Sequence, residues 1–234
     1  MGIAYNTSQV TDGLVFSIDA ANPRSYSGSG ITVNSLVSGI GGTLVNGVGF
    51  GTTNSGSFIF DGTDDFINIP HNSLLTNPNN LTINMWVRSN FTSSRYSDLI
   101  GKGTGDTDEE YTILFLSNSV YFDVGQNSGP YIQTSYTTAA NTWYNVCCTH
   151  IRSGGNSDLR LYLNGTTITA TVIGPTLTPN SNTSNLTIGQ RRNAGSSANS
   201  SFSGSISQVQ IYNRALSAQE IRQNFNATRK RYGV

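Results

Sequence analysis

The chain has 234 residues, of which 11% are charged, so its polar surface must come mainly from Ser, Thr, Asn and Gly. Thirteen basic and thirteen acidic residues cancel, which excludes the strong global field that recruits nucleic acid or an anionic membrane. No apolar run reaches the roughly 18 residues of a membrane-spanning helix. The first ten residues lack the basic and apolar regions of a signal peptide, so we expect no membrane insertion and no secretion by the usual route.

The first half of the chain is predicted to form short strands. Residues 13–20 (GLVFSIDA) alternate as a first strand, and residues 25–56 read as loops and short edge strands. In residues 57–70, the runs SFIF and FINI flank an acidic turn. Both runs are rich in aromatic and β-branched residues, which favours a buried β-hairpin across the turn.

The middle of the chain continues this pattern. Residues 81–88 (LTINMWVR) predict a strand with Leu81, Ile83, Met85 and Val87 on one face and Trp86 on the other, because side chains alternate along a strand. Further short strands are expected at residues 97–102, 111–116, 120–124 and 131–134.

The two cysteines, Cys147 and Cys148, are adjacent in a strand predicted at residues 141–151. Their side chains should point to opposite faces, so we expect both to be reduced, one in the core and one on the outer face. With two histidines and no second thiol pair, the sequence argues against a zinc site. Neither His71 nor His150 lies in a recognisable catalytic motif, so we expect structural roles for both.

The C-terminal third supplies the last strands and one helix. Residues 158–163 and 166–172 flank Asn164-Gly165, the strongest short-range signal for a hairpin, and residues 186–190 and 202–212 read as strands. A capping box of Ser217 and Glu220 begins a short amphipathic helix. We therefore predict one all-β domain over residues 1–234: a two-sheet antiparallel jelly-roll sandwich with a core over about 13–226, one short C-terminal helix and a short basic tail.

Several segments carry a resemblance to a known family: GLVFSIDAANP, FIFDGTDDFINIP, LTINMWVR, the strand with Trp143, LYLNG, LTIGQ and FSGSISQVQIYNRALSAQEI. Together they resemble the laminin-G-like members of the concanavalin A-like lectin/glucanase superfamily over most of residues 13–221. The ending QNFNATRKRYGV is similar to endings of laminin-G-like proteins from tailed phages. The resemblance implies a jelly-roll fold and a virion structural setting.

The same resemblance implies a structural calcium on the convex sheet, held by an acidic residue at the position of Ser207. A neutral hydroxyl contributes far less than a carboxylate to a hard cation, so no cofactor is expected to be required. If a structural calcium does bind, Asp19 and the turn residues Asp61, Asp64 and Asp65 are its candidate ligands. The alternative is that this turn is shaped by its Asp-Gly pair and the other carboxylates face water.

Catalysis is predicted to be absent. Glycosidases place two carboxyls on either side of the sugar bond, one of them kept protonated by an apolar environment. The chain has three glutamates, Glu109, Glu110 and Glu220. Asp106, Asp108 and Glu110 alternate, but they lie in a Gly-rich loop that is poorly suited to hold a protonated acid.

Aromatic and basic residues supply the candidate binding sites. Tyr96, Tyr111, Tyr131 and Tyr136 lie in or beside predicted loops, where rings can stack on the apolar face of a sugar; covering sheet edges or forming subunit contacts is the equal alternative. The basic run Arg229, Lys230 and Arg231 either solvates the terminus or docks on an acidic partner.

Two functional hypotheses follow. The first is a non-catalytic virion structural protein, made in the host cytoplasm and displayed on a capsid, tail or fibre. Its partners would be other virion proteins or copies of itself, with a host surface glycan as a further ligand. The second is a free extracellular carbohydrate-binding lectin or enzyme-appended module.

Overall fold

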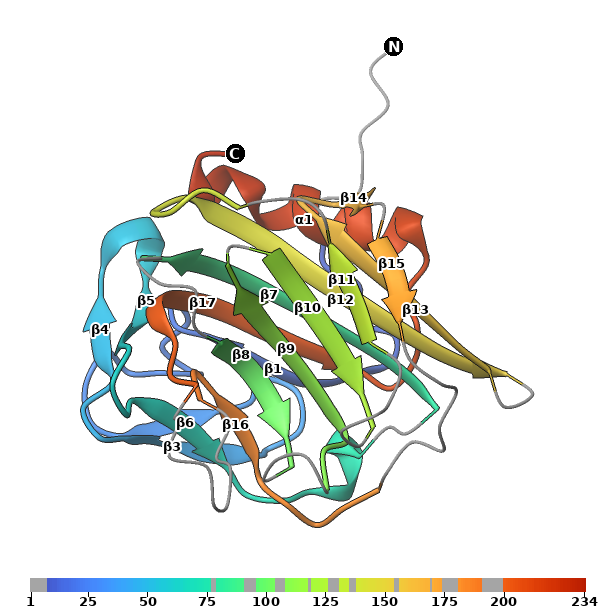
Figure 1. Ribbon diagram of the computed structural model, residues 1–234. Helices are drawn as coiled ribbons and strands as arrows, with labels where there is room; N and C mark the ends of the chain where they lie inside the picture. Colours follow the sequence, from blue (N-terminus) through green and yellow to red (C-terminus); the bar gives the residue numbers. More distant parts are fainter. Residues whose placement is uncertain are drawn as a thin grey trace.

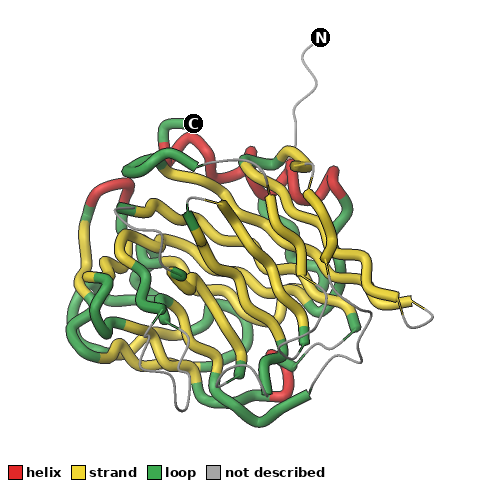
Figure 2. Tube along the Cα trace, viewed as in Figure 1, coloured by secondary structure: helices red, strands yellow, loops and turns green. Residues whose placement is uncertain are grey.

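A computed structural model describes residues 8–76, 79–90, 96–103, 108–117, 119–125, 131–134, 138–153, 156–168, 170–173, 181–190 and 200–234. Within these residues the chain folds into two antiparallel sheets and one α-helix, with two single turns of 3-10 helix, η1 (Thr53–Ser55) and η2 (Ser73–Leu75). Figures 1 and 2 show the sheets as two stacked layers of strands. The predicted all-β sandwich is confirmed.

Sheet A, in the described residues, has eight strands. Their order is β14-β13-β12-β7-β17-β5-β4, with β1 pairing on β17 beside β5. The strands are β1 (Leu14–Asp19), β4 (Gly49–Gly51), β5 (Ser57–Asp61), β7 (Asn80–Ser89), β12 (Trp143–Ser153), β13 (Asn156–Leu163), β14 (Thr166–Ile168) and β17 (Ser203–Tyr212).

Sheet B, counted over the same described segments, has nine strands in the order β15-β11-β10-β9-β8-β16-β6-β3-β2. They are β2 (Thr32–Asn34), β3 (Gly41–Val45), β6 (Phe66–Ile69), β8 (Ser97–Lys102), β9 (Tyr111–Leu116), β10 (Ser119–Val124), β11 (Tyr131–Thr134), β15 (Ala170–Ile173) and β16 (Leu186–Ile188).

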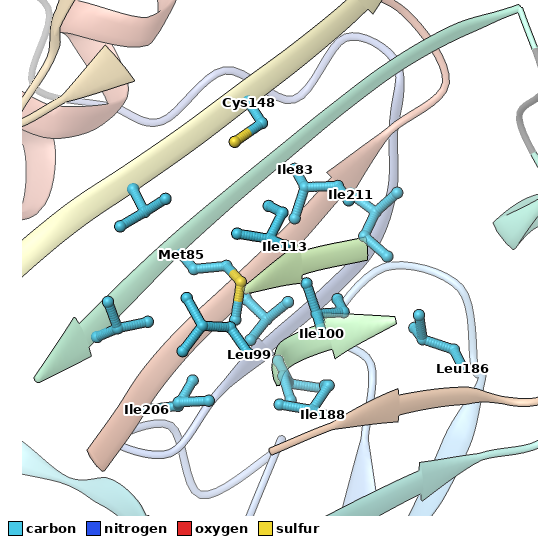
Figure 3. Packing of buried hydrophobic residues seen from close by; sticks show 14 of the residues in the cluster. Ile83, Met85, Leu99, Ile100, Ile113, Cys148, Leu186, Ile188, Ile206 and Ile211 are labelled. Atoms are coloured by element: carbon cyan, nitrogen blue, oxygen red, sulfur yellow. The ribbon is translucent and has the colours of Figure 1, made fainter. Parts of the chain in front are cut away.

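One apolar core fills the space between the sheets. Ile83, Met85 and Cys148 from sheet A face Ile100 and Ile113 from sheet B, and all five side chains are fully buried (Figure 3). Cys147 points the other way, into a smaller cluster on the outer face of sheet A. The predicted split of the two reduced cysteines between two faces is confirmed.

The segment of residues 57–70 does not form the predicted hairpin. β5 pairs with β4 and β17 in sheet A, whereas β6 pairs with β3 and β16 in sheet B. The acidic turn between them therefore carries the chain from one sheet to the other. Both strands bury apolar residues in the same core, so the predicted strands were right and their predicted pairing with each other was wrong.

The predicted Asn164-Gly165 hairpin is confirmed, since β13 and β14 pair directly across it.

The helix α1 (Ala218–Tyr232) covers part of the outer face of sheet A, along the top of the molecule in Figure 1. It begins at the predicted capping box of Ser217 and Glu220. The ring of Trp86 stacks on Tyr232 at 3.9 Å between centroids and on Phe225 at 5.8 Å. The helix runs through the residues that were predicted to form a short basic tail, so that part of the prediction is wrong.

His150 is a fully buried histidine of β12, and its Nε2 lies 3.0 Å from the Ser157 hydroxyl. Burial, and then the charge of Arg152, lower its pKa from 6.5 to about 4. The unfolded chain therefore takes up a proton between these two values while the folded chain does not, so acid favours unfolding.

We expect the free energy of unfolding to fall by about 2 kcal/mol between pH 7 and pH 5 from this residue alone. Urea unfolding at pH 7, 6 and 5 measures it. His150→Gln should flatten the curve. An unchanged pH dependence in His150→Gln would contradict this assignment.

Candidate functional site

Two tyrosines stack on the outer face of sheet B. In β10, Val120 and Phe122 point into the core, so Tyr121 between them points outward, and Tyr131 of the neighbouring strand β11 does the same. Their rings stack at 6.3 Å between centroids with an interplanar angle of 29°. Both side chains are partly exposed, which leaves ring surface accessible.

Tyr96 lies just before β8. Its side chain is 55% exposed. The pKa of the Tyr121 hydroxyl is raised, chiefly by desolvation and then by the neighbouring Tyr131 and Tyr96 hydroxyls and the Asp123 carboxylate. We call Tyr96, Tyr121 and Tyr131 the tyrosine platform: the rings of Tyr121 and Tyr131 stack, and Tyr96 and Asp123 act on the Tyr121 hydroxyl electrostatically.

The predicted glycan-binding tyrosines divide into three outcomes. Tyr96 and Tyr131 lie in the platform, whereas Tyr136 lies outside the described residues. Tyr111 is wrong as a surface candidate, because it is fully buried and donates its hydroxyl to the Leu75 carbonyl at 2.9 Å. Tyr121 was not among the predicted site residues, although the alternation in SVYFDV already indicates that its side chain faces away from the core.

The acidic turn forms a second cluster. One carboxylate oxygen from each of Asp61, Asp64 and Asp65 lies within 4.8 Å of the others. The backbone N–H of Thr63 donates to Asp61 Oδ1 at 2.7 Å, and that of Asp61 donates to Asp65 Oδ2 at 3.0 Å. We call these three residues the acidic arch; Asp19, the fourth candidate metal ligand, is not part of it.

Asp19 instead holds the guanidinium of Arg231. Nη1 of Arg231 lies 2.8 and 2.9 Å from the two Asp19 oxygens, Nη2 donates to the Gly56 carbonyl at 2.9 Å, and Nε donates to the Asn54 carbonyl at 2.6 Å. Nη2 also donates to the Ser207 hydroxyl. Ser207 is the position where the family resemblance implies an acidic ligand for calcium. In this chain the guanidinium of Arg231 supplies positive charge at that position.

The other two basic residues of the predicted docking run lie in the last turn of α1. Arg229 donates to the Val234 carbonyl at 3.3 Å, its guanidinium lies 5.9 Å from the Phe225 ring centroid, and Arg229 and Lys230 are both exposed. Docking by Arg229 and Lys230 on an acidic partner stays a prediction. Arg231 is committed to an internal contact.

Glu110 and Lys102 form a buried ion pair at 3.4 Å, with side chains 1% and 0% exposed. Lys102 Nζ also donates to the Asn182 carbonyl at 3.1 Å, its Oδ1 at 2.9 Å, and the Ser184 carbonyl at 3.0 Å. Desolvation lowers the pKa of Lys102, and Glu110 and Asp108 partly offset this. Glu110 thus neutralises the buried ammonium of Lys102. Asp106, which alternates with Glu110 in the sequence, lies outside the described residues.

A shallow pocket of about 260 Å³ lies beside the start of α1, lined in part by Ile151, Tyr162, Leu216 and Glu220. Glu220 receives hydrogen bonds from Arg214 and from the capping residue Ser217. The bond from Arg214 lowers the pKa of Glu220 to about 2, so this carboxyl is ionised at neutral pH. An acid of this kind is poorly suited to donate a proton to a leaving group.

A family model identifies the superfamily to which this β-sandwich belongs. Residues 61–222 match the laminin-G model described as the concanavalin A-like lectin/glucanases superfamily. The chain belongs to this superfamily. This laminin-G-like domain thereby confirms the family resemblance and the fold predicted from its strand order. A comparison with curated proteins gave no match.

Solved structures of similar fold are binding domains and an enzyme. The domain is similar to the binding domain of Paraclostridial Mosquitocidal Protein 1, with TM-score 0.70, 19% identity, and coverage of 92% of this chain and 52% of that chain. The domain is also similar to a structure of botulinum neurotoxin type C, whose cell entry depends on interaction with two ganglioside molecules. The TM-score is 0.69 and the identity 16%, and the match covers 92% of this chain and 51% of that chain. For Trypanosoma rangeli sialidase in complex with sialic acid the TM-score is 0.70 and the identity 17%, and the match covers 96% of this chain and 34% of that chain.

The laminin-G-like domain spans about half of the two toxin chains and about a third of the sialidase chain. At these identities the likeness shows the fold. Among the described residues of the domain, no helix has the length and apolar character that a membrane crossing needs.

Proposed function

We propose that the laminin-G-like domain is a non-catalytic carbohydrate-binding module and that the tyrosine platform is its ligand site. The observation that carries the proposal is the stack of the partly exposed Tyr121 and Tyr131 rings; the exposed Tyr96 acts electrostatically on the Tyr121 hydroxyl. Flat rings bind the C–H faces of sugars, while phenol hydroxyls and a nearby carboxylate hydrogen-bond the sugar hydroxyls. The ganglioside- and sialic-acid-linked proteins of the same fold support a glycan as the ligand class.

The non-catalytic part of the proposal rests on the three glutamates of the chain, all of which lie in the described residues. Glu110 pairs with Lys102 inside the protein, Glu220 pairs with Arg214 at a helix end, and Glu109 is buried. None of them forms with a second described carboxylate the open pair across a groove that glycoside hydrolysis needs.

We expect Tyr96→Ala and Tyr131→Ala each to weaken glycan binding at least tenfold, which corresponds to about 1.4 kcal/mol. Each substitution removes one stacking face. Binding to a glycan array that carries neutral, sialylated and bacterial-surface oligosaccharides identifies the ligand, and titration of the best glycan measures the affinity.

Ile59→Ala is the control, because Ile59 is an exposed apolar side chain, 41% exposed, in a strand of the other sheet. The control should bind as the unsubstituted chain does. Retention of full affinity in the two tyrosine variants would refute the platform as the site.

We propose the surface of a virus particle as the setting of this module, with other virion proteins or copies of the chain as neighbours. The support is the resemblance of residues 223–234 to endings of tailed-phage proteins and the weakly charged, hydroxyl-rich composition. Mass spectrometry of purified particles tests it: a stoichiometric signal supports the virion role. A particle-free monomer that binds glycans supports the free extracellular module instead.

A further inference from the structure

The acidic arch sits where β5 of sheet A passes into β6 of sheet B, so it links the two layers covalently. Its backbone is held by two internal hydrogen bonds, from Thr63 N–H to Asp61 and from Asp61 N–H to Asp65. A third bond, from Asn46 Nδ2 to the Asp64 carbonyl at 3.1 Å, ties the arch to the loop between β3 and β4. The fold therefore brings the three carboxylates together, and backbone donors hold those of Asp61 and Asp65.

One oxygen of this cluster is buried without a hydrogen-bond donor. Asp65 is 4% exposed, and while its Oδ2 accepts from Asp61, its Oδ1 has no donor among the described residues. No described lysine or arginine forms an ion pair with Asp61, Asp64 or Asp65. Leaving a buried carboxylate oxygen unpaired costs free energy, and two further carboxylates nearby add repulsion. A ligand that supplies positive charge would relieve both.

We propose that the acidic arch binds a calcium ion through the carboxylates of Asp61, Asp64 and Asp65, including the unpaired Oδ1 of Asp65. Carboxylate oxygens are the ligands that hard divalent cations prefer, and water completes the coordination. Calcium fits better than magnesium, because an irregular turn supplies oxygens without the strict octahedral geometry that magnesium demands. The ion would fix the crossing between the two sheets.

Thermal unfolding of the full chain tests the site. At calcium chloride a hundredfold above its dissociation constant, we expect the midpoint to rise by roughly 5–10 °C relative to EDTA. Asp64→Asn should lose most of this rise. In EDTA the same variant should be as stable as the unsubstituted chain or slightly more stable, because it removes repulsion between like charges.

Asp158→Asn is the control, since Asp158 is a partly exposed acid of sheet A that lies in an ion pair with Arg160; it should keep the full calcium response. Should Asp64 prove needed for folding, Asp65→Asn takes its place with the same expected loss. No calcium response in the unsubstituted chain, an equal response in Asp64→Asn, or an equal rise with magnesium chloride would each overturn the proposal. No glycan enters this experiment, so its outcome is independent of the tyrosine platform.

Discussion

Glu110→Gln is expected to lower the free energy of unfolding by about 3–5 kcal/mol, because it removes the ion-pair partner of the buried Lys102 ammonium. Lys102 lies at the end of β8 and its side chain is 0% exposed, so water cannot replace the lost carboxylate. Its hydrogen-bond partners Asn182 and Ser184 are neutral acceptors, and the charge of Asp108 is left to compensate the ammonium only in part. Urea unfolding at neutral pH measures the loss.

Asp158→Asn is also the matched control here, because the ion pair of Asp158 with Arg160 is 47% and 57% exposed. An ion pair in contact with water contributes at most about 1 kcal/mol. The same pair of variants tests the non-catalytic assignment. A hydrolytic activity that Glu110→Gln abolishes while the unfolding free energy stays unchanged would contradict both the structural role of Glu110 and the absence of catalysis.

Arg231→Ala is expected to cost about 2–4 kcal/mol, since it removes the cation from a partly buried carboxylate and the donors from several oxygens. Arg231 and Asp19 are 17% and 16% exposed, so solvent replaces these interactions incompletely. The loss should also loosen the end of α1, where Tyr232 stacks on Trp86. Urea unfolding gives the energy, and tryptophan fluorescence reports on the stacking.

Arg229→Ala is the matched control for this prediction. Arg229 lies in the same helical turn but is exposed, and its guanidinium contacts the Phe225 ring at 5.9 Å. An exposed contact of this kind is worth about 0.5–1 kcal/mol. Arg231→Lys should fall between the two, because lysine keeps the charge but lacks the planar fork that bonds several oxygens at once. Equal effects of Arg231→Ala and Arg229→Ala would show that the internal contacts of Arg231 carry no special weight.

Part of the candidate site was within reach of sequence reasoning. Period-two alternation in SVYFDV places Tyr121 outside the core, and the same rule places Tyr131 outside once Ile132 is taken as buried. Tyr111 misled because it directly follows an acidic loop, yet it opens β9 as a core residue. Proximity to a predicted loop says little about exposure when the strand starts at that residue.

The sequence by itself determined the local features of this protein: the strands, the Asn164-Gly165 hairpin, the capping box of α1 and the opposite faces of Cys147 and Cys148. Each depends on neighbours along the chain, through side-chain alternation, turn geometry or capping. Taken together, these local features were enough to indicate a two-sheet sandwich and its family.

Only the tertiary structure decided which partners meet across long separations. The chain crosses between sheets at the acidic arch because β5 pairs with β4 and β17 in sheet A, whereas β6 pairs with β3 and β16 in sheet B. An irregularity at Ser207 breaks the alternation of β17, so that Ile206 and Ile211 both enter the core. Arg231 meets Asp19 across 212 positions. Such contacts depend on how the two sheets pack as whole layers. The alternation of side chains along a single strand carries no information about that packing.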